Sequence, residues 1–277
     1  MSSQSVKDKI RVIVRDKSVN FNVILRQYMY ERFVERVAVS QYKFNFIFKG
    51  GYYLSTIFGV YNRMTMDIDA CLKNTKLSKE NLLKIVNEII SIDIFDGATF
   101  FIDEISLIRD EDEYGGYRVS LTVKIDQMKE SFHLDVVTGD SITPKEIKYK
   151  YISVIGDKQI QVLAYNLETV LAEKLETVLS KNLNNSRMKD FYDIYLLMTF
   201  KKDSIDKDIL EKAIRNTFKK RNFHDDVLTI FKEISNSKLL ESKWIGYARR
   251  KNIKNISYQD TISAIYELVK YSSLIFV

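Results

Sequence analysis

Strand-like spacing of apolar residues gives way to continuous helical spacing near residue 160, and this change constrains the fold more than any other feature. All the strands that we predict from apolar alternation lie before residue 156. After Asn166 the apolar residues recur at helical spacing almost to the end. We therefore expect a mixed α/β domain over residues 1–160, followed by an all-helical domain over residues 161–277.

The predicted fold class is α/β (α+β), with a mixed β-sheet flanked by helices in the first domain. Alternation predicts strands over residues 44–48, 66–72, 99–108, 117–125, 131–137 and 149–155. Acidic and glycine residues at 110–116 are typical of a hairpin connection. Helical spacing predicts helices over residues 20–40, 52–59, 78–90, 167–179, 189–200, 205–218, 225–234 and 257–275.

The composition is that of an ordinary globular protein, with 45% apolar and 29% charged residues. The single cysteine, Cys71, can form no internal disulfide, which is typical of a reducing compartment. No apolar run approaches the roughly 20 residues that span a bilayer. The first 17 residues also lack the apolar core of a secretory signal. These features predict a cytoplasmic protein without a membrane partner.

The positive charge of the chain is concentrated in its second part. Residues 160–277 contain 20 basic and 15 acidic side chains, whereas the first 159 residues contain 23 and 22. The basic residues of the second part form two clusters: Lys212, Arg215, Lys219, Lys220 and Arg221, then Lys243, Arg249, Arg250, Lys251 and Lys254. Such a surface attracts partners that carry phosphate. A solvated lysine-rich surface remains an equal interpretation of the charge alone.

A pair of glycines and a pair of carboxylates form the sharpest local feature. Gly50 and Gly51 end a predicted strand, and Asp67 and Asp69 lie in the next one. Side chains alternate between the faces of a strand, so the two carboxylates share a face, and we expect Met66, Ile68 and Ala70 to point into the core. Carboxylate oxygens suit Mg²⁺, and glycines let backbone N–H groups approach a phosphate. Two solvent-facing acids at a strand end would have the same pattern.

A third acid strengthens the metal interpretation. Asp135 shares a strand face with His133, opposite Leu134 and Val136. Three carboxylates can hold two Mg²⁺ ions for phosphoryl chemistry. We interpret His133 as a packing residue and Cys71 as a small buried residue.

A further set of charged residues lies in the helical region. Lys174 follows a predicted apolar stripe and could project at the domain interface. Lys189, Asp190 and Asp193 are spaced to share one helix face. Surface ion pairs, together with a helix cap at Ser186, explain this pattern equally well.

Taken together, these motifs resemble the AbiEii family, nucleotidyltransferase-like toxins of bacterial abortive-infection systems in the DNA polymerase β-type superfamily. The resemblance spans roughly residues 44–200 and rests on five segments: Lys49–Tyr52, Arg63–Asp69, His133–Asp135, Ala172–Leu175 and Arg187–Asp193. It implies an Mg²⁺-dependent nucleotidyltransferase, with Mn²⁺ as an alternative metal.

The resemblance also implies roles for individual residues. Asp67, Asp69 and Asp135 match the metal-binding acids, and Asp135 would assist deprotonation of the attacking hydroxyl. Lys174 matches a lysine that binds the triphosphate, and either Asp190 or Asp193 is the acid of the last motif, with Asp193 the closer match. The residues implied in nucleotide binding are Lys49, Gly50, Gly51, Tyr52, Lys174, Arg187, Lys189 and Asp190. Tyr52 stands where many relatives have serine, so backbone contacts must suffice there.

The implied function is a toxin that adds a nucleotide to RNA, at the 3′ end of tRNA, and so arrests growth during phage infection. An AbiEi-type antitoxin would be its operon partner, with or without direct contact. Two alternatives remain. The acceptor could be a hydroxyl of a protein or small molecule, which would require an enclosed polar pocket. The chain could instead be a non-catalytic nucleotide- or RNA-binding module, although its intact acids argue against that.

Overall fold

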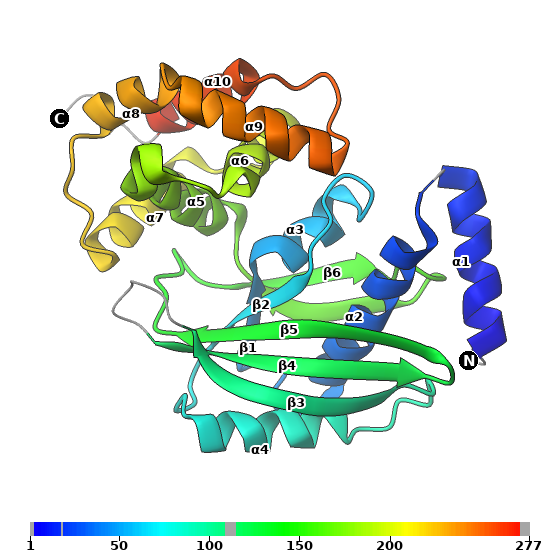
Figure 1. The fold of residues 1–277 in the computed structure, drawn as a ribbon. Coiled ribbons are helices and arrows are strands. Elements are labelled where there is room, and N and C mark those ends of the chain that lie inside the picture. The colour runs from blue at the N-terminus through cyan, green and yellow to red at the C-terminus, as the bar shows by residue number, and fades with distance from the viewer. Residues whose placement is uncertain (1–2, 18, 109–114, 272–277) are drawn as a thin grey trace. The chain divides into compact units, whose positions relative to one another are not determined.

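The computed structural model describes residues 3–17, 19–108 and 115–271 (Figure 1). The helices are α1 (Ser3–Lys17), α2 (Phe21–Val39), α3 (Gly50–Phe58), α4 (Lys79–Ile90), α5 (Leu167–Lys181), α6 (Met188–Phe200), α7 (Lys207–Lys220), α8 (Val227–Ser235), α9 (Lys238–Lys251) and α10 (Tyr258–Tyr271). The strands are β1 (Phe46–Lys49), β2 (Asp67–Leu72), β3 (Thr99–Ile108), β4 (Gly116–Ile125), β5 (Met128–Thr138), β6 (Ile147–Ile152) and β7 (Gln159–Ala164). No helix in these ranges is long and apolar enough to cross a membrane.

The chain divides into two compact units. Unit 1 comprises Met1–Asp140 and Glu146–Tyr165, and unit 2 comprises Ser141–Lys145 and Asn166–Val277. All seven described strands lie in unit 1, and α5 to α10 lie in unit 2. The predicted class, a mixed α/β region followed by a helical region, is therefore confirmed.

Unit 1 is built on one mixed sheet with the strand order β3-β4-β5-β2-β1-β7-β6. The β2–β5 and β1–β7 pairs are parallel, whereas β1–β2, β3–β4, β4–β5 and β6–β7 are antiparallel. Helices α2 and α4 contact each other and pack against the sheet, as Figure 1 shows for α4 beneath β3. Their apolar side chains join alternate residues of the strands in one core, so each central strand has a buried face.

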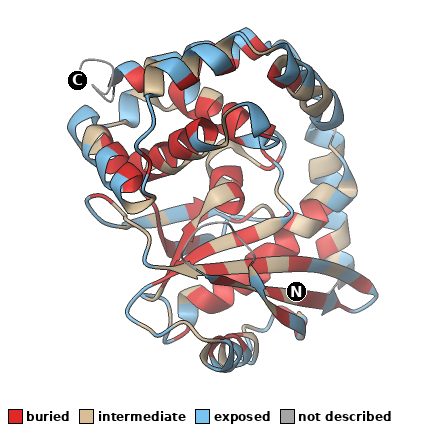
Figure 2. Cartoon of the chain, turned by 60° about the vertical axis from the view of Figure 1, so that its left-hand side comes forward, coloured by how far each residue is buried: buried red, intermediate tan, exposed pale blue. Residues whose placement is uncertain are grey.

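Unit 2 is a helical bundle in which α5 packs on α6 and α7, and α6 packs on α10. Several helices begin at a side chain that accepts a backbone N–H, as Asn166 does for α5 and Asp206 for α7. Figure 2 shows buried residues along the central strands, and a mixture of buried and exposed residues along several of the C-terminal helices. Trp244, almost fully buried, is the anchor of α9.

Three elements were missed by the sequence analysis: α1, β7 and α9. Strand β7 alternates buried Ile160 and Val162 with exposed glutamines, but it falls where a linker was expected. In α9 only Leu240 and Trp244 are buried, and two apolar positions are too few to show helical spacing in the sequence. The predicted helix 257–275 ends at Tyr271, and its last four positions lie outside the described residues. Most of the predicted connection at 110–116 also lies outside them.

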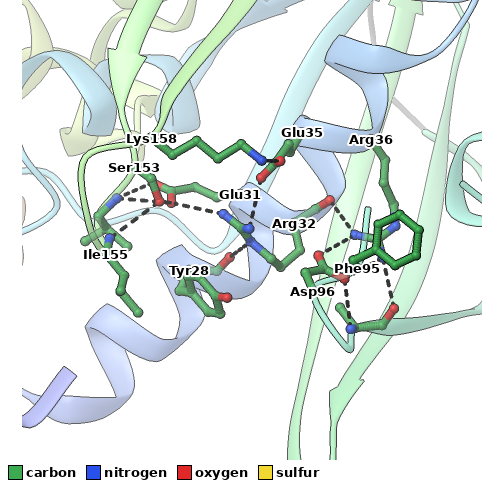
Figure 3. A network of polar contacts seen from close by, with 12 residues as sticks. Tyr28, Glu31, Arg32, Glu35, Arg36, Phe95, Asp96, Ser153, Ile155 and Lys158 are labelled. Carbon is green, nitrogen blue, oxygen red and sulfur yellow. Dashed lines mark hydrogen bonds and ion pairs between the residues drawn. The ribbon is translucent and has the colours of Figure 1, made fainter. Parts of the chain in front are cut away.

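A network of buried charges links α2 to two other parts of unit 1 (Figure 3). Glu31 accepts hydrogen bonds from the Ser153 hydroxyl at 2.5 Å and from the Val154 N–H at 3.0 Å. Further along α2, Arg36 donates two hydrogen bonds to the Asp96 carboxylate, at 2.7 and 2.8 Å. The pKa of Glu31 is raised to about 7. Burial is the main cause, and it outweighs the opposing effects of the hydrogen bonds from Ser153 and Val154 and of the Arg32 charge.

Because the pKa of Glu31 is higher in the folded chain than the ordinary 4.5, the folded state holds its proton more strongly than the unfolded state. We expect stability to fall as the pH rises from about 4.5 through 7, by up to about 3 kcal/mol. Glu31→Gln should remove this fall. Urea denaturation of both proteins between pH 5 and 8 checks it, and parallel stability profiles would contradict the assignment.

Candidate active site

Four charged residues lie side by side in one row across four strands of unit 1. The register pairs Lys49 of β1 with Asp69 of β2, Asp69 with Asp135 of β5, and Asp135 with Arg118 of β4. Paired residues on neighbouring strands project from the same face of a sheet. The fold therefore brings two of the predicted acids together between two cations.

The third predicted acid, Asp67, lies two residues before Asp69 and so projects from the same face of β2. Ile68 and Ala70 are buried on the other face, as expected, but Met66 is 52% exposed, so its predicted place in the core is wrong. Strand β2 begins at Asp67, and the alternation does not extend back to Met66.

The pKa of Asp67 is raised above its ordinary value. Burial is the main cause, the carboxylates of Asp135 and Asp69 add to it, and Arg118 and His133 oppose it. Placing three acids on one face therefore costs free energy, which a bound cation would relieve.

The glycine turn lies directly against Asp69. Gly50 has a φ of +61°, which favours glycine, and a Cβ at this position would be 2.1 Å from Asp69 Oδ2. The N–H of Gly51, in the first turn of α3, donates to the same oxygen at 3.1 Å. A Cβ at Gly51 would also be 2.6 Å from Thr65 Oγ1. Both glycines are thus required by the close approach of the acid-bearing segment.

Asp135 is held by Arg118, a residue that the sequence analysis missed. The Arg118 Nε donates to Asp135 Oδ1 at 2.8 Å, and its Nη2 donates to Oδ2 at 2.7 Å. His133 lies one row away, where its Nδ1 is 3.2 Å from the Ser120 hydroxyl. Leu134 and Val136 are fully buried, so the predicted faces of β5 are confirmed.

The donor set of this face fits a divalent cation, because it consists of carboxylate oxygens on adjacent rigid strands. Asp67, Asp69 and Asp135 are the residues that would hold it. In the described ranges, however, no three His, Cys, Asp or Glu side chains are already arranged to bind a metal. Asp69 accepts one N–H bond, from Gly51, on one oxygen, whereas both oxygens of Asp135 accept from Arg118, so Asp135 is the acid that would have to change partners.

Two predicted nucleotide-binding side chains of unit 1 have internal partners. Lys49 Nζ lies 2.5 Å from Asp140 Oδ2 and over the ring of Tyr165. Tyr52 is buried, and its hydroxyl is 2.7 Å from that of Tyr151. Tyr52 therefore offers the site its backbone and not its hydroxyl, as its place in the glycine motif indicated. Cys71 is buried, and burial raises its pKa to about 11, so the thiol is unsuited to act as a nucleophile.

The remaining predicted residues form a second cluster, which lies within unit 2. Lys174 of α5 places its ammonium 2.8 Å from Asp190 Oδ1 and 2.6 Å from Asp193 Oδ2, both on α6. Arg187 Nε donates to Asp190 Oδ2 at 2.8 Å. Burial by itself would raise the pKa of Asp190, yet Lys174 and Arg187 hold it well below its ordinary value.

The charge cluster of unit 2 is an interior feature. The side chains of Asp190 and Asp193 are 1% and 0% exposed, and that of Lys174 is 10% exposed. Asp190 and Asp193 share a helix face, as predicted, but Lys189 is exposed and lies outside the cluster. The cap predicted at Ser186 is wrong, because α6 begins at Met188 and its cap residue is Arg187, which makes no side-chain capping bond. Both candidates for the acid of the last motif thus bind the same ammonium.

Comparisons with known proteins point to one family. The family model described as "Nucleotidyl transferase AbiEii toxin, Type IV TA system" matches residues 32–261. Two solved structures from Helicobacter pylori share the fold: JHP933, and a protein titled a putative nucleotidyltransferase. Each is 18% identical with a TM-score of 0.50; the matches cover 93% of this chain, 93% of JHP933 and 96% of the second protein. No significant similarity to a curated protein was found.

Proposed function

Because this chain belongs to the AbiEii family of nucleotidyl transferase toxins, from type IV toxin–antitoxin systems, we propose that it transfers a nucleoside monophosphate from an NTP to RNA. The proposed acceptor is the 3′ end of tRNA, and the consequence is a block of translation in the cytoplasm that serves phage defence. Family membership implies a nucleotide substrate and an antitoxin partner. We propose that this partner is an AbiEi-type protein.

The strongest support for this proposal is that Asp69 and Asp135 are paired on neighbouring strands, beside the Gly50–Gly51 turn. Phosphoryl transfer needs acids that hold a metal next to backbone groups that hold a phosphate. The chain supplies both from the neighbouring strands β2 and β5 and from the first turn of α3. The N-terminus of α3 is also favourable for a phosphate, because its N–H groups and its dipole attract negative charge.

In the proposed reaction, the 3′-hydroxyl oxygen of the acceptor attacks the α-phosphorus of the NTP. A new P–O bond forms, the bond to the β-phosphate oxygen breaks, and pyrophosphate leaves. Asp135 accepts the hydroxyl proton, and Asp67 and Asp69 orient the reactants. A bound Mg²⁺ would polarise the phosphate oxygens and lower the pKa of the hydroxyl.

We propose that the cluster of unit 2 binds the triphosphate of an NTP. Asp190 and Asp193 would position the Lys174 ammonium, which would bind triphosphate oxygens as a point charge. Arg187, whose side chain is 45% exposed, would add a second positive group next to Asp190.

The acceptor RNA requires a basic surface, and unit 2 offers one at the end of α9. Arg249, Arg250 and Lys251 are exposed in the last turn of this helix. Neutralising all three with glutamine should weaken tRNA binding and flatten its salt dependence, because each lost phosphate contact lowers the slope of log affinity against log salt by about 0.9 or less. Nucleotide affinity should stay unchanged. Binding titrations at several salt concentrations check this, and an unchanged slope would make the cluster a solvated surface.

Incubation of the pure protein with each α-labelled NTP and Mg²⁺ tests the proposed function. Total tRNA, cell protein and a small-molecule extract are supplied as separate acceptors. The proposal predicts label on tRNA, removable by 3′-exonuclease. Label on protein or on a small molecule alone would overturn the RNA acceptor, and label on none of them would overturn catalysis.

A further inference from the structure

We propose that Arg118 is a built-in counter-ion that occupies the carboxylate face of unit 1 until a divalent cation replaces it. Metal loading would then be an exchange, in which the guanidinium leaves Asp135 as the cation arrives. This inference rests on the proposed function, because it concerns the same three acids. It assigns to Arg118 a role in controlling metal affinity.

The geometry of the ion pair carries the first step. Arg118 lies directly opposite Asp135 on the neighbouring antiparallel strand, and its fork takes both carboxylate oxygens at 2.8 and 2.7 Å. A bidentate fork of this kind covers the lone pairs that a metal would need. Asp135 therefore cannot keep both bonds to Arg118 and also bind a cation through both oxygens.

The charges around Arg118 carry the second step. Its guanidinium contacts Asp135 directly, and Asp135 is the register partner of Asp69 on β2. Asp67 lies two residues before Asp69 and projects from the same face. A single guanidinium thus partly balances all three predicted metal ligands, which is the electrostatic task of the cation itself.

Exposure carries the third step. The Arg118 side chain is 41% exposed, so it can turn into water without leaving a buried charge unpaired. The Arg36–Asp96 pair has the same bidentate form, but its side chains are only 2% and 6% exposed, as expected of a permanent structural pair. Arg118 therefore has the access to solvent that an exchange needs, which Arg36 lacks.

The test measures Mn²⁺ binding to the full metal-free chain by electron paramagnetic resonance, without nucleotide. We expect Arg118→Gln to bind Mn²⁺ about 10-fold more tightly, because a positive charge and a competitor for Asp135 are both removed. The Mn²⁺ affinity of Arg118→Lys should lie between those of the wild type and Arg118→Gln, since lysine keeps the positive charge but cannot form the two parallel hydrogen bonds. Lys73→Gln is the matched control, because Lys73 forms a pair of similar exposure with Glu146 at 2.8 Å, beyond the opposite end of β2 from Asp67.

Affinity in Arg118→Gln equal to or weaker than wild type would overturn the exchange. If that variant does not fold, Arg118→Lys decides the question by the same criterion. Asp67→Asn separates this inference from the proposed function. Loss of Mn²⁺ binding in Asp67→Asn, with unchanged binding in Arg118→Gln, would reject only the exchange. Unchanged binding in Asp67→Asn would reject the metal site itself.

Discussion

Lys174→Met is expected to lower the free energy of unfolding by about 3–5 kcal/mol, because removing one partner of a buried ion pair leaves an uncompensated charge. Here two carboxylates would be left, since Asp190 and Asp193 are both buried against the ammonium. Asp190 also pairs with the Arg187 guanidinium at 2.8 Å. Thermal and urea denaturation of the variant measure the loss. From the sequence alone, surface ion pairs were one of two interpretations of these residues. An exposed pair contributes at most about 1 kcal/mol, so the observed burial raises the expected loss.

Lys202→Met is the matched control for this prediction. Lys202 also pairs with an acid on another helix, Glu267, at 2.5 Å, but the two side chains are 42% and 47% exposed. Its loss should cost less than about 1 kcal/mol. If Lys174→Met is no less stable than this control, the Lys174 cluster does not stabilise unit 2. Nucleotide titration of the variant at a temperature where it remains folded then measures the triphosphate role separately.

Asp67→Asn and Asp69→Asn should each abolish growth arrest in cells while the protein stays folded. Both changes remove a proposed metal ligand, and such losses reduce turnover by at least about 100-fold. Asp67→Asn should also equal or exceed the wild-type stability at pH 7, because the raised pKa of Asp67 means that folding disfavours its charged form. Growth after induction, together with a melting curve for each protein, checks both expectations.

Glu104→Gln is the control for the acid variants, because Glu104 is an exposed acid on the edge strand β3. It should keep full toxicity. A folded Asp67→Asn protein that still arrests growth would remove Asp67 from the site. A folded Asp69→Asn protein that still arrests growth would remove Asp69 from the site. It would also remove the functional link between the acids and the glycine turn.

The strand alternation predicted one half of the candidate site correctly. It placed Asp67 and Asp69 opposite Ile68 and Ala70, and the burial of the two apolar residues confirms this. This succeeded because side-chain direction on a strand is a local property with a period of two residues. Met66 was misplaced for the same reason, since the alternation holds only within the strand, which begins at Asp67.

The partners of the acids could not be predicted, because they depend on register and on packing between helices. Arg118 meets Asp135 only because β4 and β5 are joined by two residues, 126–127, which pair Ile125 with Met128. The predicted strands, 117–125 and 131–137, are five residues apart, whereas β5 begins at Met128; a two-residue connection is the signal that fixes such a register. The burial of Lys174 between two acids of another helix leaves no comparable trace in the sequence, since an apolar stripe does not determine which polar residues it encloses.

The most direct test of the central claim is transfer of label from an α-labelled NTP to total tRNA, measured with Mg²⁺ for the wild-type chain and for Asp67→Asn. The account predicts labelled tRNA 3′ ends with at least one of the four NTPs for the wild type. It also predicts at least about 100-fold less label for the folded Asp67→Asn protein. No labelled RNA with any NTP, or equal labelling by the two proteins, would contradict it.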